Sequence, residues 1–309
     1  MTPAQHGLAV LAGALIFDLA IGEPPNVLHP VVWMGRFLRA MRRRAPKAPP
    51  AAFVYGAGMA LAGPLVFGAG AWALVRALSA WPWVQLLVEI YLLKSAFALR
   101  GLGAAGAEVA QSLRAGDLTA ARYALRSLVS RDTSRLPPSL LAAAAIESVA
   151  ENASDSVIAP LGFFLLLGVP GALAYRAANT LDAMIGYHGE TEWLGKAAAR
   201  LDDLLNLIPA RITALLLVLA AASCRASPLL ALRVWWRDAA STESPNAGRP
   251  MAAMAGALGV ELEKVGHYRL GAGGAAPRAA DVDRAVAMLF VAGALAALLA
   301  AAGVWVRAA

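Results

Sequence analysis

The sequence predicts an all-α, polytopic membrane protein, and three observations support this prediction. Hydrophobic residues make up 59% of the 309 residues and charged residues only 15%, whereas soluble domains average roughly 45–50% and about 25%. The mean hydropathy is +0.60. Apolar segments recur along the chain, and no segment shows the strict apolar–polar alternation that indicates a half-buried strand.

Five apolar segments come close to the roughly 20 residues that a helix needs to cross a bilayer. They are residues 7–21, 53–78, 83–99, 157–178 and 285–306, and residues 204–223 form a weaker sixth candidate. Between the second and third segments, Trp81-Pro82-Trp83 is typical of an outer turn with interfacial aromatic side chains. The sequence therefore predicts about five membrane segments.

The positions of basic residues predict how these segments are oriented in the membrane. A cluster follows the first segment and consists of Arg36, Arg39, Arg42, Arg43, Arg44 and Lys47. Because Lys and Arg accumulate in cytoplasmic loops, the cluster places this loop in the cytoplasm and the N-terminus outside. We expect a multi-pass protein of the cell inner (cytoplasmic) membrane, with the lipid bilayer as a partner and the active site facing the cytoplasm.

Two regions depart from straight spans. Residues 157–187 contain Pro160 and Gly168-Val169-Pro170-Gly171, and the apolar halves beside the break are each shorter than a bilayer. This pattern predicts a broken or re-entrant segment shielded by protein. Residues 100–156 are Arg-rich and helix-like without a long apolar run, which predicts a cytoplasmic helical insertion.

The C-terminal part adds a loop. Residues 237–284 are polar and rich in Gly and Pro, so we predict a cytoplasmic loop before the last span. This requires residues 204–223 to re-enter the membrane together with residues 228–236. The whole chain, 1–309, is expected to form a single integral membrane domain.

Several classes of protein are excluded or disfavoured. The lone Cys224 cannot form an internal disulfide or a multi-thiolate zinc site. The net charge is +7, but no nucleic-acid-binding motif accompanies it, so no nucleic-acid partner is expected. We expect residues 7–21 to stay in the mature protein, because they lead into Gly22-Glu23-Pro24-Pro25 rather than a small-residue cleavage site.

The strongest chemical signal is an acidic segment near residue 150. Glu147, Glu151 and Asp155 follow an i, i+4, i+8 spacing, which puts them on one face of a regular helix. Such carboxylates repel one another unless a cation, an Arg or a proton compensates. We predict catalytic roles and Mg²⁺ coordination for all three, completed by phosphate oxygens, and a substrate or ATP contact for Asn152. A solvated stripe of charge is the alternative.

A second acidic cluster begins at residue 200. Asp202 and Asp203 are predicted metal ligands, and Arg200 and Asn206 are predicted to bind ATP or substrate, because oxygen ligands and a cationic group fall within two turns. The alternative is a helix N-terminus, where the dipole favours acidic side chains.

Polar residues also interrupt the apolar segment before this cluster. Arg176, Asn179 and Asp182 follow an i, i+3, i+6 spacing, and ionisable groups at membrane depth indicate function by default. We predict a catalytic role for Asp182 and binding roles for Arg176 and Asn179. Polar contacts between helices are the alternative.

Near the N-terminus, Asp18, Glu23, His29 and Arg36 gather at one membrane edge. His29 is a candidate general base, although a lone His is more often structural, and Arg36 is a candidate substrate ligand.

Two loops resemble phosphate-binding turns. Residues 130–134 include Arg131, and residues 241–250 include Asn246 and Arg249. All three are predicted to contact ATP or substrate, although ordinary turn chemistry also explains both loops. No P-loop motif occurs anywhere in the chain.

Six motifs in a fixed order carry a family resemblance. They are Phe17-Asp18 with Gly22-Glu23-Pro24-Pro25, His29 to Arg36, Leu128 to Thr133, Glu147 to Pro160, Asn179 to Tyr187, and Ser244 to Gly248. With them, the chain resembles the adenosylcobinamide-phosphate synthase family, the CobD/CbiB proteins of cobalamin biosynthesis. Two departures are Glu23, where the family more often has Asp, and a looser motif around Tyr268, which puts a contact by this tyrosine in doubt.

The resemblance implies a cobalamin-biosynthesis enzyme. Its reaction would be ATP-dependent amide formation between adenosylcobyric acid and (R)-1-aminopropan-2-ol or its phosphate, which gives adenosylcobinamide or its phosphate. ATP and Mg²⁺ are the implied cofactors. The implied partners are the corrinoid and the amine, and later enzymes of cobalamin assembly are further candidates.

Two other functions compete with this one. A Mg²⁺-dependent membrane prenyl- or phospho-group transferase would use an acidic motif, which Asp202-Asp203-x-x-Asn206 imitates loosely. A transporter would use broken helices around a midplane site. The concentration of ionisable residues at segment ends and in loops favours an active site at the membrane surface.

Overall fold

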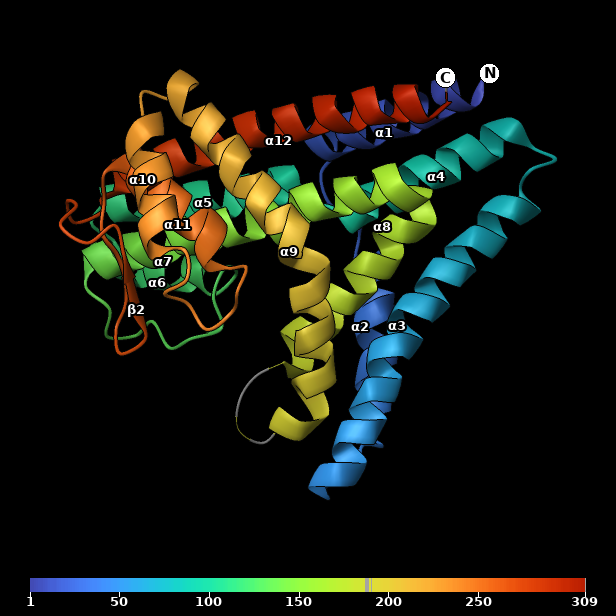
Figure 1. The fold of residues 1–309 in the computed structure, drawn as a ribbon, viewed down its shortest axis with the longest axis horizontal. Coiled ribbons are helices and arrows are strands. Elements are labelled where there is room, and N and C mark those ends of the chain that lie inside the picture. The colour runs from blue at the N-terminus through green and yellow to red at the C-terminus, as the bar shows by residue number, and fades with distance from the viewer. Residues whose placement is uncertain (187–188, 190, 309) are drawn as a thin grey trace. The chain divides into compact units, whose positions relative to one another are not determined.

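The computed structural model describes residues 1–186, 189 and 191–308, so Tyr187, the last residue of the fifth motif, lies outside the described residues. The first helices are α1 (Pro3–Ala20), α2 (Pro30–Arg42), α3 (Pro49–Ala77), α4 (Pro82–Ala96), α5 (Leu99–Arg114) and α6 (Leu118–Leu125). They are followed by α7 (Pro138–Ala153), the π-helix η1 (Ser154–Ile158), α8 (Ala159–Ile185), α9 (Glu192–Ser223), α10 (Pro228–Asp238), α11 (Gly248–Leu258) and α12 (Ala279–Ala308). Strands β1 (Leu262–Lys264) and β2 (Tyr268–Leu270) form an antiparallel hairpin before α12 (Figure 1).

The prediction of an all-α polytopic membrane protein is confirmed. Within the described residues, helices long and apolar enough to cross a membrane are Pro3–Ala20, Pro49–Ala77, Pro138–Ile185, Glu192–Ser223 and Ala279–Arg307. Many of their large apolar side chains are exposed, among them Leu65 and Leu298. Because lipid is as apolar as these side chains, a bilayer accommodates them without a hydrophobic penalty.

The third predicted segment is a shorter helix than expected. α4 has 15 residues and rises about 22 Å, against a hydrocarbon core of about 30 Å. It ends at Phe97, which has extended backbone angles, and α5 starts two residues later. α9, which contains the weaker candidate 204–223, runs as one helix of 32 residues that is long and apolar enough to cross a membrane. The re-entry of residues 204–223 with residues 228–236, which a cytoplasmic loop 237–284 requires, stays a prediction.

The break predicted in residues 157–187 is confirmed at Gly168. This residue has φ 68° and ψ −162°, a region that is essentially restricted to glycine. Pro170 follows. It has no backbone N–H to donate to the preceding turn, and its ring clashes with a carbonyl group of that turn, so a continuous helix is disfavoured. The two halves of α8 therefore meet at a sharp bend (Figure 1).

The chain forms two compact units. The first comprises Met1–Ala98, Ala159–Asn206 and Ala297–Ala309, and the second comprises Leu99–Ile158 and Leu207–Ala296. In the first unit, α3 packs along α8, and a side chain at Gly56 would collide with the carbonyl oxygen of Leu194. Small residues allow membrane helices to approach this closely.

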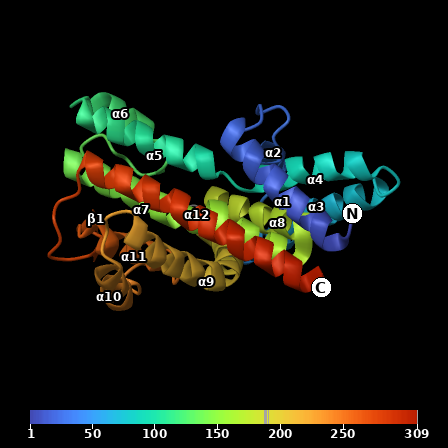
Figure 2. The same ribbon diagram turned by 90° about the horizontal axis from the view of Figure 1, so that it is seen from above.

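In the second unit, α5 packs against both α6 and α7, and the pair α5–α6 is visible from above in Figure 2. α7 is almost wholly buried, and its Ala142–Ala145 run has no exposed surface. α11 packs on α10, where Gly256 lies against the carbonyl oxygen of Leu230.

Residues 237–284 are therefore not only a loop. They contain the buried helix α11 and the β1–β2 hairpin, in which Glu263 pairs with Arg269. α11 is built from Ala, Met and Gly, and these small side chains let it pack closely although the composition of the segment is typical of a loop.

Candidate active site

Glu147 is the centre of the acidic segment in the second unit. Its side chain is only 5% exposed, and its Oε2 accepts a hydrogen bond of 2.9 Å from Nη2 of Arg131. Oε1 of Glu147 and Nε of Arg131 are buried without a hydrogen-bond partner among the described residues. A buried carboxylate with a spare lone pair is costly to desolvate, so this carboxyl group is expected to have a further partner during function.

The hairpin adds two residues that the sequence reasoning did not assign. β1 lies against α7, and the pKa of Tyr268 is raised by burial and by the nearby carboxylates of Glu147 and Glu151. Its hydroxyl lies 3.8 Å from Sδ of Met251. The ammonium group of Lys264 lies 5.9 Å from the tyrosine ring and interacts electrostatically with Glu147. Despite its looser motif, Tyr268 is thus placed beside the acidic face of α7.

The helix type changes within the acidic segment. α7 ends at Ala153, and the π-helix η1 places Asp155 in a wider turn. In the described part of the chain, no group of three or more His, Cys, Asp or Glu side chains could hold a metal ion. The described residues therefore do not form a three-carboxylate metal group, and the metal roles of Glu147, Glu151 and Asp155 stay predictions.

Asn152 is engaged within its own helix. Its Nδ2 donates to the carbonyl oxygen and to Oγ of Ser148, at 3.0 and 3.2 Å, and its Oδ1 accepts from Ser156 at 3.3 Å. Its predicted contact with substrate or ATP has no support in these hydrogen bonds.

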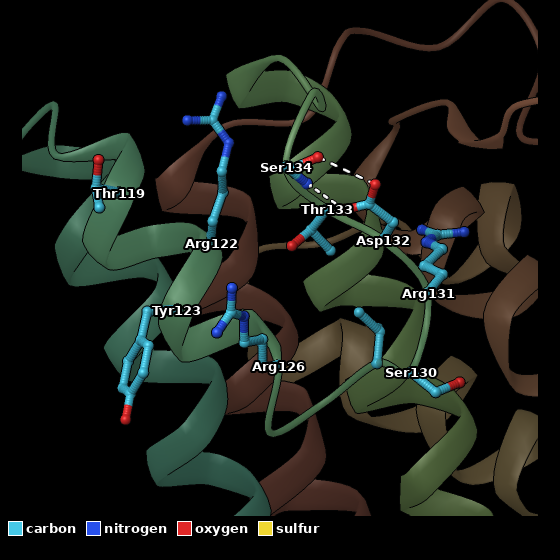
Figure 3. A pocket seen from close by; sticks show the side chains of 10 residues that line it. Thr119, Arg122, Tyr123, Arg126, Ser130, Arg131, Asp132, Thr133 and Ser134 are labelled. Carbon is cyan, nitrogen blue, oxygen red and sulfur yellow. Dashed lines mark hydrogen bonds between the residues drawn. The ribbon is translucent and has the colours of Figure 1, made fainter.

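A cavity of about 740 Å³ lies beside this segment, between α6 and residues 129–134 (Figure 3). Three arginines line it: Arg122 and Arg126 come from α6 and its C-terminal end, and Arg131 comes from the facing loop. Among the described residues that line it, Asp132 is the only acidic one. This carboxylate accepts hydrogen bonds from the backbone N–H and the hydroxyl of Ser134, which lower its pKa. The cavity thus has an excess of positive charge.

The loop before α11 holds two more predicted residues of the second unit. Asn246 is buried, and Nε of Arg249 donates to the carbonyl oxygen of Pro245 at 3.3 Å. Burial and the nearby charge of Arg211 lower the pKa of Arg249. Two neighbouring guanidinium groups favour an anion, which would relieve their repulsion.

In the first unit, a chain of charged groups joins α1, α2 and α4. Nζ of the fully buried Lys94 lies 3.1 Å from Oδ1 of Asp18 and 2.9 Å from Oε1 of Glu23. Oε2 of Glu23 lies 2.9 Å from Nε2 of His29, whose Nδ1 accepts from the backbone N–H of Val31. Both ring nitrogens of His29 are thus engaged within the protein. Lys94 was missed by the sequence reasoning, although a lysine within an apolar segment signals such a contact.

A polar network also links α8 and α9 in this unit. Asp202 accepts hydrogen bonds from Asn179 at 3.2 Å and from Asn206 at 2.9 Å, one to each carboxylate oxygen. Tyr175 donates to Asn206 at 2.8 Å, and Arg176 donates to Asn179 at 3.4 Å. The structure brings these predicted residues together, but their hydrogen bonds are those of an interhelical contact.

The remaining predicted residues are spread over the first unit. Arg200 lies 3.9 Å from Asp203 in a largely exposed pair. Asp182 lies in the last turn of α8, and Arg36 is exposed on α2. Their predicted roles stay predictions.

The fold and these sites define a multi-pass, all-α membrane protein with a buried carboxylate beside an arginine-lined cavity. A family model described as CobD/Cbib protein matches residues 11–302. The chain therefore belongs to the CobD/Cbib protein family.

Individual relatives cover nearly the same region. Cobalamin biosynthesis protein CobD of Dehalococcoides mccartyi is 46% identical over 272 residues, which cover 85% of this chain and 86% of that protein. Cobalamin biosynthesis protein CobD of Klebsiella pneumoniae is 44% identical over 81% of this chain and 80% of its own length. Cobalamin biosynthesis protein CbiB of Salmonella typhimurium is 39% identical over 94% and 95%. No solved structure matches the chain.

Proposed function

We propose that the protein acts in cobalamin biosynthesis as an adenosylcobinamide-phosphate synthase. It would join the side-chain carboxylate of adenosylcobyric acid to the amine of (R)-1-aminopropan-2-ol or its phosphate, at the expense of ATP. The names of the relatives support the pathway. The observation that supports the chemistry is the buried Glu147–Arg131 pair beside a cavity with three arginines.

A carboxylate must be activated before an amine can displace one of its oxygens. In the proposed reaction, a carboxylate oxygen of the corrinoid attacks the γ-phosphorus of ATP, and ADP leaves. The amine nitrogen then attacks the acyl carbon, inorganic phosphate leaves, and the nitrogen loses a proton. Arginine forks suit the phosphoryl oxygens, and a carboxylate such as Glu151 suits the proton. The engaged ring nitrogens of His29 make it a weaker base in this arrangement.

The residues present fit Mg²⁺ in a limited way. Mg²⁺ in such sites usually takes one or two protein carboxylates and completes its shell with phosphate oxygens and water. Glu147 and Glu151 supply two carboxylates, and Oε1 of Glu147 is buried without a hydrogen-bond partner among the described residues. When bound, the ion would neutralise charge on the phosphates.

The competing transferase has less support. Its acidic motif would need Asp202 to face a diphosphate, but both carboxylate oxygens of Asp202 accept hydrogen bonds from asparagines. We therefore place the reaction at the second unit, and propose that this site faces the cytoplasm, the source of ATP.

The test is a direct assay with the purified protein. It is incubated with adenosylcobyric acid, Mg²⁺-ATP and either aminopropanol or its phosphate, and the corrinoid is examined by mass spectrometry. The expected product has gained one amine and lost one water, and appears only with ATP. An unchanged corrinoid with both amines would contradict the proposal.

A further inference from the structure

The arginine-lined cavity of the second unit contains groups that none of the motifs explains. Arg122 and Arg126 lie outside the six motifs, yet they line the same cavity as Arg131. Arg131 pairs with Glu147, so Arg122 and Arg126 have only the carboxylate of Asp132 among the described lining residues, and Ser134 already donates to both of its oxygens. Like charges repel when they share a cavity, so this arrangement needs an anion to balance it.

The free donors of these arginines point to an anion rich in oxygen. Arg122 donates from Nη2 to the carbonyl oxygen of Leu136 at 3.1 Å, and its Nε is buried without a hydrogen-bond partner in the described part of the chain. The guanidinium of Arg126 lies 5.9 Å from the ring of Tyr123 and donates no hydrogen bond within residues 1–186, 189 and 191–308. Forked donors of this kind match phosphoryl oxygens, which accept several bonds at once.

We propose that this cavity is a phosphoryl-binding pocket in which Arg122 and Arg126 hold the phosphate of a substrate next to Arg131. The proposal rests on the proposed function for the source of the phosphate, which is either the polyphosphate chain of ATP or the phosphate of the amine. Thr119 and Thr133 also line the cavity, and their hydroxyl groups can donate to the remaining oxygens.

Arg131 connects this pocket to the carboxylates of α7. It lines the cavity and at the same time donates to Glu147 at 2.9 Å. A phosphoryl group in the pocket competes with Glu147 for the same guanidinium fork. Binding therefore loosens the Arg131–Glu147 pair and makes the carboxylate of Glu147 available at the moment when the phosphorylated ligand arrives.

Binding to the full-length protein in detergent tests the pocket. Titration calorimetry uses tripolyphosphate, ATP, aminopropanol phosphate and, as a neutral probe, free aminopropanol. Arg126→Gln removes a guanidinium that donates no hydrogen bond to the described residues, so we expect normal folding and roughly tenfold weaker binding of the phosphorylated ligand. Arg122→Gln is expected to act in the same direction, although it also removes the contact with Leu136.

Arg135→Gln is the matched control, because Arg135 is an exposed neighbour that does not line the cavity. It should bind like the parent protein. Asp132→Asn is a second test in the opposite direction, because it removes the only acidic group of the lining but keeps an acceptor for Ser134. We expect several-fold tighter phosphate binding, a gain that misfolding cannot produce.

The source of the phosphate follows from the probes. Weaker binding of ATP and tripolyphosphate alone assigns the pocket to the nucleotide, and weaker binding of aminopropanol phosphate alone assigns it to the amine. Parental affinity for every phosphate in Arg126→Gln and Arg122→Gln, or an equal loss in Arg135→Gln, overturns the pocket. If those variants bind normally while the parent protein still makes the amide, the pocket fails and the proposed function stands. If no amide forms but Arg126→Gln weakens phosphate binding, the proposed function fails and the pocket stands.

Discussion

Lys94 shows how one charged side chain can organise apolar helices. It is fully buried and contacts the carboxylates of Asp18 and Glu23, so two acidic groups share one cation. Burying charges costs several kcal/mol per ion unless partners compensate. The three side chains therefore depend on one another, and removal of the shared cation affects both carboxylates.

We expect Lys94→Met to destabilise the protein by about 3–5 kcal/mol, because it removes the cation beside the fully buried carboxylate of Asp18. Thermal unfolding in detergent measures this as a large fall in the midpoint. Lys47→Met, at an exposed position, should change the midpoint little. A small effect at Lys94 would mean that water or lipid headgroups already solvate this cluster.

Acidification should act on the same cluster through Glu23. Burial raises the pKa of Glu23, but hydrogen bonds from His29 and Lys94 lower it further, so that it lies below its usual value of 4.5. A carboxylate with a lowered pKa stabilises the folded state above that usual value, and this stabilisation is lost as the pH falls through the lowered pKa.

The midpoint of unfolding, measured from pH 7 downwards, should therefore fall more steeply below about 4.5 in the parent protein than in Glu23→Gln. Glu108→Gln, at an exposed position of α5, should retain the parental profile. Parallel profiles for the parent protein and Glu23→Gln would show that Glu23 does not contribute to acid sensitivity.

On α7, substitution of Glu151 should reduce catalysis without reducing stability. Its negative charge repels that of Glu147. Glu151→Gln removes this repulsion, so the unfolding midpoint should stay nearly unchanged. We expect amide formation to fall roughly 100-fold or more, the range for loss of an acid–base group. Glu108→Gln serves as the control for activity. Parental turnover in Glu151→Gln would remove this residue from the active site.

At the scale of elements, the bend of α8 is the feature that sequence predicted best. Gly168 adopts angles that are open only to glycine, and Pro170 prevents a continuous helix. Both causes are local, so both can be identified in the sequence. The π-helix after α7 has no such local signature, and the spacing of Glu147, Glu151 and Asp155 was therefore treated as that of a regular helix.

Gly168→Ala should destabilise the protein by about 1–3 kcal/mol, because a Cβ is strained at this φ and ψ. Gly162 lies in the first half of α8 with open space around it, so Gly162→Ala should be neutral or stabilising by roughly 0.5–1 kcal/mol. Unfolding midpoints of both variants give the comparison. Equal midpoints would show that the bend tolerates an ordinary helical conformation.

Other elements could not be predicted from the sequence, because they depend on packing between segments that are distant in the chain. α11 is buried by packing on α10, and its small residues in a Gly- and Pro-rich segment predict a loop when they are read alone. Similarly, Tyr268 reaches Glu147 only because the hairpin folds onto α7. Helical spacing identified Glu147 and the turn-like loop sequence identified Arg131, but these local signals indicate neither Tyr268 nor the arginines of α6.

At the scale of the whole molecule, each unit is assembled from separate stretches of chain. The second unit combines Leu99–Ile158 with Leu207–Ala296, and the proposed active site takes residues from both stretches. The two stretches must therefore offer their site residues on one side of the membrane. We propose that this side is the cytoplasm, because the proposed reaction takes its ATP from there.

Single cysteines test this sidedness in a Cys224→Ser background. Ser134→Cys lies in the cavity loop and Ser241→Cys in the loop before α11, and both native serines are exposed. In right-side-out and inverted vesicles, a membrane-impermeant maleimide should label both only from the cytoplasmic face. Labelling of residues 134 and 241 from opposite faces would separate the two stretches across the membrane, and the proposed site could then not include residues from both.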